Sequence, residues 1–223
     1  MEKKIRAVVF DMDGVLFDTE NLCISSWRVI AKRHGLEGIE EVNRRCIGRT
    51  VEDTRRILYE AYPDKDMAAI HDERRAYERR IIAEEGVPLK PFAGDILKAL
   101  KKTGVLIGLA SSTRQATVEP ELRSVGFYDY FDTIVCGDMI ERSKPHPDIY
   151  IAACERLGVS PADAAAVEDS FNGIRSAKAA GMMTVMVPDI IQPDDEILKS
   201  VDFLCSDLSE AEKQLLGLID MEG

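Results

Sequence analysis

A run of apolar residues ends in two carboxylates and a glycine at Val8-Val9-Phe10-Asp11-Met12-Asp13-Gly14, and this stretch constrains the fold more than any other. Its β-branched and aromatic residues predict a buried strand. The two aspartates then follow the carboxyl end of that strand, where open α/β sheets bind their ligands, and the glycine allows the chain to turn. Two carboxylates this close repel each other unless a cation lies between them or one is protonated. A hard divalent ion such as Mg²⁺, which prefers oxygen ligands, meets this requirement.

Two other local structures, a calcium-binding loop and an ordinary turn, also contain closely spaced Asp and Gly. An EF-hand calcium loop requires a ligand at its fifth position and glycine at its sixth, whereas this chain has Val15 at the fifth and glycine at the fourth. The spacing therefore excludes a calcium loop. An ordinary strand-to-helix turn also favours Asp and Gly, and the stretch by itself does not exclude that reading.

The composition limits the partners of the chain. Its 223 residues carry a formal net charge of −11, whereas nucleic-acid binders usually show a basic footprint, so we expect no nucleic-acid partner. An anionic substrate requires cations gathered locally at its site. The five cysteines are scattered without a CxxC pair, which favours reduced thiols and a cytoplasmic location. The N-terminal apolar run is too short for a signal-peptide core, no stretch is long enough for a membrane span, and we expect a monomer.

The segment after the first strand contains helical patterns only. Apolar residues recur at helical spacing over residues 19–34, where Gly35 ends the pattern, and residues 51–61 and 65–85 are also predicted to be helical. We find no convincing strand before Pro88. A helical block in this position predicts an inserted domain. The predicted domains are a core of residues 1–17 and 92–223 and a helical cap of residues 18–91.

The remaining chain alternates strands and helices. Strands are predicted at residues 105–110, 133–136, 164–167, 184–187 and 201–205, and helices at 95–102, 115–125, 148–157, 172–180 and 209–218. Pro120 lies inside one of these helices and indicates either a kink or a late start. The alternation predicts right-handed crossovers and a parallel sheet covered on both faces. The predicted fold is therefore α/β, with a Rossmann-like parallel-sheet core and an inserted α-helical cap domain.

Polar side chains follow two later strands and occupy one proline-rich loop. They are Ser111 and Ser112 after the second strand, Glu168 and Asp169 after the fourth, and Lys144 in the loop. Because parallel strands bring their carboxyl ends to one edge of the sheet, these groups can converge with the first acidic pair. Four carboxylates, one ammonium and one or two hydroxyls suit a metal and a phosphoryl group better than hydride or acyl transfer.

Four short motifs, in this order, resemble those of the haloacid dehalogenase superfamily of phosphohydrolases. They are Asp11-Met12-Asp13-Gly14, Ser111, Ser143-Lys144-Pro145 and Glu168-Asp169-Ser170. The helical insert directly after the first motif is similar to the small α-helical cap of that superfamily. Asp-Thr-Glu at residues 18–20 and Lys-Pro-His-Pro-Asp at residues 144–148 further resemble the β-phosphoglucomutase-like branch, which handles small phosphorylated sugars.

The resemblance implies a role for each matching core residue. Asp11 would be the nucleophile that forms an aspartyl-phosphate, and Asp13 the acid that protonates the leaving oxygen and then the base that activates water. Lys144 would neutralise the phosphoryl group and the nucleophile. Ser111, with Ser112 beside it, would bind the phosphoryl group. A carboxylate nucleophile divides one difficult displacement into two easier ones, and cations offset its repulsion from an anionic phosphate.

The resemblance also implies a magnesium cofactor and contacts from the cap. Mg²⁺ would be held by four acidic residues, namely Asp11, Asp13 through its backbone carbonyl, Glu168 and Asp169. Glu20 and Arg49, both in the predicted cap, are candidates for contacts with a small phosphorylated substrate. A solvated surface position is the alternative for Arg49, and a favourable charge in the first helical turn is the alternative for Glu20.

Two departures from the mutases of this branch favour simple hydrolysis. Cys23 stands where those mutases have a cap histidine, and in Ile47-Gly48-Arg49-Thr50-Val51 the arginine is displaced toward the glycine. We therefore expect a magnesium-dependent phosphatase of small phosphorylated metabolites, and sugar phosphates in particular. A β-phosphoglucomutase-type phosphotransferase is the alternative. A non-catalytic phospho-acceptor switch is more remote, because an acid–base residue two positions from the nucleophile serves turnover and not storage.

Overall fold

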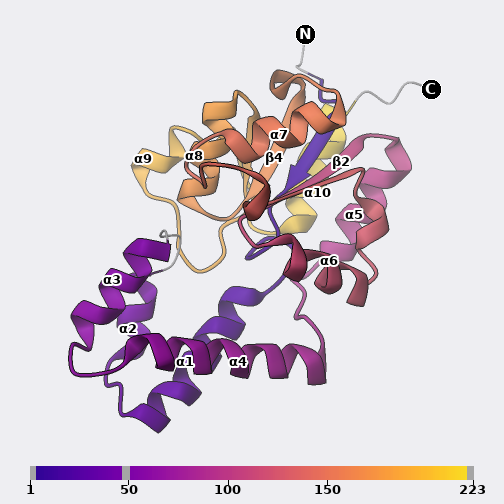
Figure 1. Cartoon of the computed structure of the whole chain (residues 1–223). Coiled ribbons are helices and arrows are strands. Elements are labelled where there is room, and N and C mark those ends of the chain that lie inside the picture. The colour runs from indigo at the N-terminus through magenta and orange to yellow at the C-terminus, as the bar shows by residue number, and fades with distance from the viewer. Residues whose placement is uncertain (1–3, 47–50, 220–223) are drawn as a thin grey trace. The chain divides into compact units, whose positions relative to one another are not determined.

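The computed structural model describes residues 4–46 and 51–219, which belong to two compact units (Figure 1). The sheet unit comprises Met1–Phe17 and Leu89–Gly223, and the helical unit comprises Asp18–Pro88. The chain re-enters the sheet unit at Leu89 rather than at residue 92. None of the helices in the described ranges is both long enough and apolar enough for a membrane span.

The sheet unit is built on six parallel strands. These are β1 (Ala7–Phe10), β2 (Leu106–Ser111), β3 (Thr133–Cys136), β4 (Ala164–Glu168), β5 (Met183–Met186) and β6 (Phe203–Leu204). Their order is β3-β2-β1-β4-β5-β6, and every pairing is parallel. This arrangement confirms the predicted Rossmann-like α/β core. The strand order reverses between β1 and β4, and ligands bind at such a switch point, beyond the carboxyl ends of the strands.

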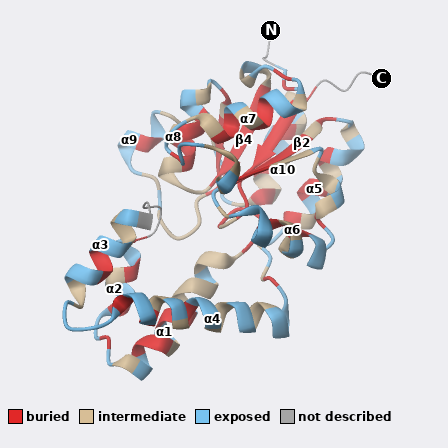
Figure 2. Cartoon of the chain, in the orientation of Figure 1, coloured by how far each residue is buried: buried red, intermediate tan, exposed pale blue. Residues whose placement is uncertain are grey.

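Helices cover both faces of the sheet (Figure 1). The helices of this unit are α5 (Ala93–Thr103), α6 (Gln115–Ser124), α7 (Asp148–Leu157), α8 (Phe171–Ala180), α9 (Asp195–Leu198) and α10 (Leu208–Leu218). On one face, α7 packs on β1, β2 and β3, and α8 packs on β4 and β5. On the other face, α5 contacts both β2 and α10. The two central strands, β1 and β4, are buried along their whole length, and Figure 2 shows β4 as buried.

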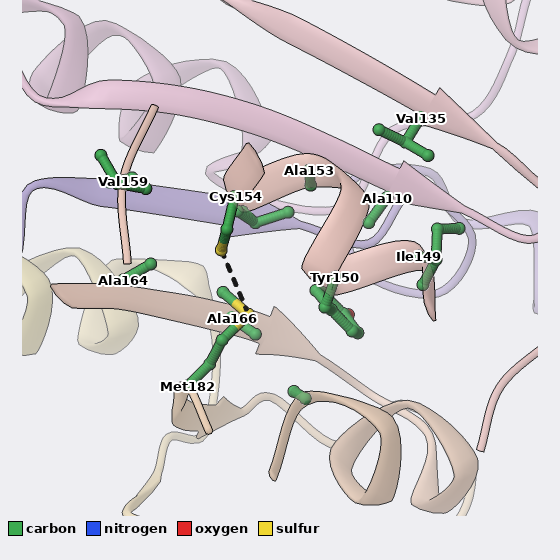
Figure 3. Packing of buried hydrophobic residues seen from close by; sticks show 13 residues of the cluster. Ala110, Val135, Ile149, Tyr150, Ala153, Cys154, Val159, Ala164, Ala166 and Met182 are labelled. Atoms are coloured by element: carbon green, nitrogen blue, oxygen red, sulfur yellow. Dashed lines mark hydrogen bonds between the residues drawn. The ribbon is translucent and has the colours of Figure 1, made fainter. Parts of the chain in front are cut away.

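Small strand residues allow α7 to approach the sheet closely (Figure 3). Ala110, Ala164 and Ala166 from the strands are buried together with Tyr150 and Cys154 of α7. A large helix side chain therefore meets a small strand side chain, which fills the interface without voids. This packing fixes Tyr150, which is fully buried, close to the carboxyl end of β4.

The structure corrects several predicted boundaries. α6 runs from Gln115 through Pro120, so the helix does not start late at the proline. Asp18 occupies the N-cap position before the first helix, which begins at Thr19 as predicted. A short helix, α2 (Ile39–Arg44), was not predicted, because six residues are too few to display a helical period. The last strand has only two residues, Phe203–Leu204, because only this part of the predicted strand pairs with its neighbour β5.

The helical unit contains α1 (Thr19–His34), α2, α3 (Val51–Ala61) and α4 (Met67–Glu85). α4 begins at Met67, two residues later than predicted from residue 65, because the Asp66 side chain caps it by accepting a hydrogen bond from the backbone N–H of Ala69. Trp27 and Ile30 of α1 are buried with Ile70 of α4. Apolar packing between α1 and α4 therefore provides much of the core of this unit.

A buried arginine joins α1 to α4 inside the helical unit. Arg74 pairs with Glu78 on its own helix, and its guanidinium donates a hydrogen bond to the Cys23 sulfur at 3.1 Å. The guanidinium also lies 5.2 Å from the ring centroid of Trp27. Ser26 donates a hydrogen bond to Glu78 at 2.9 Å. Arg74 thus satisfies a carboxylate that would otherwise be unpaired in a mostly apolar interface.

Replacing Arg74 by Met is expected to destabilise the helical unit by about 2–3 kcal/mol. This is below the about 3–5 kcal/mol expected for breaking a fully buried pair, because the Glu78 side chain is 18% exposed. Amide hydrogen exchange of α1 and α4 measures the effect within this unit. The matched control is Arg79→Met on the same helix, where the arginine is exposed and a change below about 0.5 kcal/mol is expected. Equal protection factors in the two variants would contradict the structural role of Arg74.

Candidate active site

The turn after β1 positions the first acidic pair. The backbone N–H of Asp11 donates to the carbonyl of Val167 at 2.9 Å, which extends the pairing of β1 with β4 by one residue. Gly14 has φ +80°, and its N–H donates to the carbonyl of Phe17 at 2.9 Å. A positive φ is readily adopted by glycine and not by other residues. The glycine therefore lets the chain turn back directly beyond the strand, so that Asp11 remains 7% exposed at its end.

Lys144 lies at the centre of the buried polar groups. Its ammonium donates to Asp11 Oδ1 at 2.5 Å, to Glu168 Oε1 at 2.6 Å and to the carbonyl of Ala110 at 3.0 Å. An ammonium has three N–H donors, and each has a partner here. The Lys144 residue is 8% exposed and Glu168 is fully buried. The loop lysine predicted from the sequence thus meets the ends of β1, β2 and β4.

Glu168 accepts hydrogen bonds on both of its carboxylate oxygens. Besides Lys144, Oε1 accepts from the hydroxyl of Tyr150 at 2.8 Å. Oε2 accepts from the Ser170 hydroxyl at 3.0 Å and from the backbone N–H groups of Ser170 and Asp169, both at 3.2 Å. The sequence motifs did not predict Tyr150 as a site residue. Its only sequence signal was a polar hydroxyl on the apolar face of the helix that follows the lysine loop.

Asp13 is hydrogen-bonded to Thr113, a residue that was also not predicted for the site. Thr113 donates its hydroxyl proton to Asp13 Oδ2 at 2.9 Å. The backbone N–H of Thr113 donates to the hydroxyl oxygen of Ser111 at 3.1 Å, and Ser111 is fully buried whereas Ser112 is exposed. The run of three hydroxyl residues after β2 was the available signal, and its third member is the one that contacts the acidic pair.

The buried charges shift the pKa values of their neighbours. Burial lowers the pKa of Lys144, but Asp11 and Glu168 outweigh burial and hold it above the usual lysine value. Burial raises the pKa of Asp11 to about 8, against the opposing effect of Lys144. A further cation near Asp11 would lower this pKa, because an opposite charge favours the ionised carboxylate. The site is therefore electrostatically suited to bind a cation in addition to Lys144.

Three of the four predicted metal ligands lie together. Asp11, Glu168 and Asp169 can each offer a carboxylate oxygen, and these oxygens lie within 4.8 Å of one another. Opposite ligands of one Mg²⁺ are about 4.2 Å apart, twice its about 2.1 Å bond length, so small shifts would bring these oxygens onto one ion. The carboxylate of Asp13 is not in this group, which is compatible with its predicted contribution through a backbone carbonyl. Hard oxygen donors fit magnesium.

The predicted contacts from the helical unit stay predictions. Arg49 lies outside the described residues. Glu20 lies in the first turn of α1, where a negative charge is favourable. Cys23 packs on Arg74 through its sulfur, and burial raises the pKa of its thiol to about 12. Cys23 is therefore a neutral thiol at neutral pH.

A family model and several known proteins are similar to this chain over most of its length. The family model described as "Haloacid dehalogenase-like hydrolase" matches residues 8–187. The phosphorylated carbohydrates phosphatase of Thermotoga maritima is 35% identical to the chain over 80% of this chain and 82% of that protein. The β-phosphoglucomutase of Bacillus subtilis is also 35% identical, over 82% and 83% of the two chains. The crystal structure of CbbY from Rhodobacter sphaeroides in complex with phosphate has a TM-score of 0.73 at 29% identity, covering 92% of this chain and 96% of that chain.

Replacing Gly14 by Ala is expected to weaken Mg²⁺ binding about tenfold or more. A Cβ at Gly14 would lie 2.8 Å from the carboxylate carbon of Asp169, so this carboxylate must move. Displacing the groups that orient metal ligands typically costs about 10–100-fold in affinity. Isothermal titration calorimetry with Mg²⁺ measures the effect.

The matched control is Gly104→Ala. Gly104 has φ +77°, close to that of Gly14, and nothing lies within 4 Å of its added Cβ. Both variants are expected to lose about 1 kcal/mol of stability from backbone strain, and only Gly14→Ala should lose metal affinity. Equal Mg²⁺ affinities would remove Asp169 from the metal site.

Proposed function

Because the chain belongs to the haloacid dehalogenase-like hydrolases, we propose that it is a magnesium-dependent phosphatase that hydrolyses small phosphorylated sugars through an aspartyl-phosphate. The membership confirms the resemblance predicted from its four motifs. One observation carries the proposal. Asp11, which matches the nucleophile of this superfamily, lies 2.5 Å from the Lys144 ammonium at the carboxyl ends of β1 and β4, and a second carboxylate follows two residues later.

In the first proposed step, a carboxylate oxygen of Asp11 attacks the phosphorus of the substrate. The bond between phosphorus and the sugar oxygen breaks as the bond to Asp11 forms, and Asp13 gives its proton to the departing oxygen. Lys144 offsets the repulsion between the anionic nucleophile and the anionic phosphoryl group. Ser111 is expected to donate its hydroxyl proton to the phosphoryl group, because its oxygen already accepts the N–H of Thr113.

In the second step, Asp13 is ionised and acts as a base. It removes a proton from water, the oxygen attacks phosphorus, and the bond from phosphorus to Asp11 breaks to release inorganic phosphate. The hydroxyl of Thr113 donates to Oδ2 of Asp13 at 2.9 Å and orients this carboxylate for proton transfer. Mg²⁺, which Asp11, Asp169 and the backbone carbonyl of Asp13 would hold, would supply charge neutralisation for the phosphoryl oxygens.

The substrate class rests on the relatives. They include a phosphatase of phosphorylated carbohydrates and a β-phosphoglucomutase, both 35% identical. Cys23 carries a neutral thiol where the mutases of the β-phosphoglucomutase-like branch have a histidine. This difference favours hydrolysis over transfer of the phosphoryl group back to a sugar intermediate. We further propose that the enzyme acts as a monomer in the cytoplasm. The five cysteines are all free, which is compatible with a reducing compartment.

Phosphate release from a panel of sugar and polyol phosphates is expected to require Mg²⁺ and Asp11. EDTA should abolish turnover and added Mg²⁺ should restore it, because the grouped carboxylates of Asp11, Glu168 and Asp169 outweigh the charge of the Lys144 ammonium and would repel an anionic phosphate. Asp11→Asn should reduce release to the background, since an amide oxygen is a poor nucleophile. Asp129→Asn, which alters an exposed carboxylate of the same unit, is the control and should retain wild-type turnover. Full activity in EDTA would contradict the metal requirement.

The same panel separates hydrolysis from isomerisation. β-Glucose 1-phosphate is included and assayed in parallel for glucose 6-phosphate. Free phosphate as the product supports the phosphatase. Glucose 6-phosphate without free phosphate would instead assign a mutase and overturn the weight given to Cys23.

Asp13→Asn is expected to lower turnover by about 10²–10⁴-fold, the usual contribution of a general acid–base group. Its effect on Mg²⁺ affinity should be small, since a side-chain amide leaves the backbone carbonyl of residue 13 in place. Single-turnover phosphate release and Mg²⁺ titration measure the two quantities separately. Wild-type turnover in this variant would remove Asp13 from the mechanism.

A further inference from the structure

We propose that Tyr150 is a positioning residue, which acts through Glu168 to hold the Lys144 ammonium beside Asp11. The inference rests on the proposed function of the site. It assigns to Glu168 the role of counter-ion for Lys144 and not that of a metal ligand. The groups that face the metal are then the carboxylates of Asp11 and Asp169 and the backbone carbonyl of Asp13.

The hydrogen bonds of Glu168 carry the first step. A carboxylate has about four lone-pair sites, and Glu168 accepts five hydrogen bonds, from Lys144, Tyr150, the Asp169 N–H, the Ser170 N–H and the Ser170 hydroxyl. A metal ion would have to displace at least one of these donors. A fully buried carboxylate with all its sites filled is thus better suited to balance the charge of Lys144.

The position of Tyr150 carries the second step. Its hydroxyl donates to the same oxygen, Oε1, that accepts the Lys144 ammonium. Its ring lies 5.0 Å from that ammonium, within the range of a cation–π contact. The Tyr150 side chain projects from α7 into the apolar cluster between this helix and the sheet (Figure 3). The ring therefore cannot move easily, and the hydroxyl fixes one end of the Tyr150–Glu168–Lys144 chain.

The shared oxygen links Tyr150 to catalysis. Lys144 donates to Asp11 and to Glu168 at almost equal distances, 2.5 Å and 2.6 Å. The Tyr150 hydroxyl withdraws part of the electron density of Oε1, which limits the pull of Glu168 on the ammonium. Without the hydroxyl, Glu168 attracts Lys144 more strongly and can shift toward it. Lys144 would then neutralise Asp11 and the phosphoryl group less well.

Tyr150→Phe tests the proposal, because it removes the hydroxyl and keeps the ring. We expect kcat to fall about tenfold, with KM for the sugar phosphate changed less than about twofold, since a misplaced catalytic group affects the reacting state more than substrate binding. The affinity of the Mg²⁺-saturated protein for orthovanadate, which mimics the phosphoryl group in transfer, should fall by a similar factor. Calorimetric Mg²⁺ affinity of the substrate-free protein should stay within about twofold of wild type.

Thr184→Val is the matched control for the loss of a buried hydroxyl. Thr184 lies near the start of β5, is fully buried, and its hydroxyl donates to the carbonyl of Ser200 at 2.7 Å. Both variants are expected to lower Tm by a few degrees. Only Tyr150→Phe should change kcat and orthovanadate affinity. Equal losses of kcat in the two variants would indicate a general effect of destabilisation and overturn the positioning role.

The remaining outcomes separate this proposal from the proposed function. A drop of about tenfold or more in Mg²⁺ affinity in Tyr150→Phe is the result expected if Glu168 binds the metal, and it would overturn the proposal. Unchanged kcat and orthovanadate affinity would overturn it as well. If the wild-type protein hydrolyses none of the sugar phosphates but Tyr150→Phe still weakens orthovanadate binding, the positioning role stands and the substrate assignment fails. Absence of both hydrolysis and orthovanadate binding in the wild type would overturn both.

Discussion

The ion pair of Lys144 with Asp11 and Glu168 is the interaction on which the site depends. Removing an ammonium and two carboxylates from water costs several kcal/mol per ion, and only close pairing and further hydrogen bonds offset that cost. Here the ammonium fills all three of its donor positions. The three partners come from the ends of β1, β2 and β4, so the pairing is possible only when these strands lie parallel and adjacent in the order observed.

The strand order explains why the acidic groups meet at one point. β1 lies between β2 and β4. After β1 the chain forms β2 and β3 on one side of this strand, and it then forms β4, β5 and β6 on the other side. Ligands of open α/β sheets bind beyond the carboxyl ends of the strands at such a point, which is where β1 and β4 end. Gly14 lies directly against the end of β4, because a side chain at this position would overlap the carboxylate of Asp169. The absence of a Cβ at that position brings the turn after β1 close to the end of β4.

The sequence predicted the parts of this structure that depend on local patterns. Apolar runs identified the buried strands, and the convergence of Asp11, Lys144 and Glu168 followed from parallel strands sharing one edge. The sequence did not identify Tyr150 or Thr113, because the role of each depends on the direction of a single hydroxyl in the packed tertiary structure. A tyrosine in an apolar helix face is equally compatible with simple core packing. α2 escaped prediction for a different reason, since one and a half turns carry no measurable period.

The hydrogen bonds divide the carboxylates of the site into groups with different electrostatic surroundings. Glu168 is satisfied entirely by protein donors, whereas Asp11 accepts from Lys144 on one oxygen. Asp13 accepts from Thr113, which belongs to a different strand end. Carboxylates that share a site need different surroundings if one is to act as nucleophile and another as acid and base. In this protein, the proposed nucleophile Asp11 is paired with the Lys144 ammonium, and the proposed acid–base residue Asp13 accepts from a neutral hydroxyl. Under the proposed mechanism, this difference suits Asp11 to attack phosphorus and Asp13, two residues later, to transfer the proton.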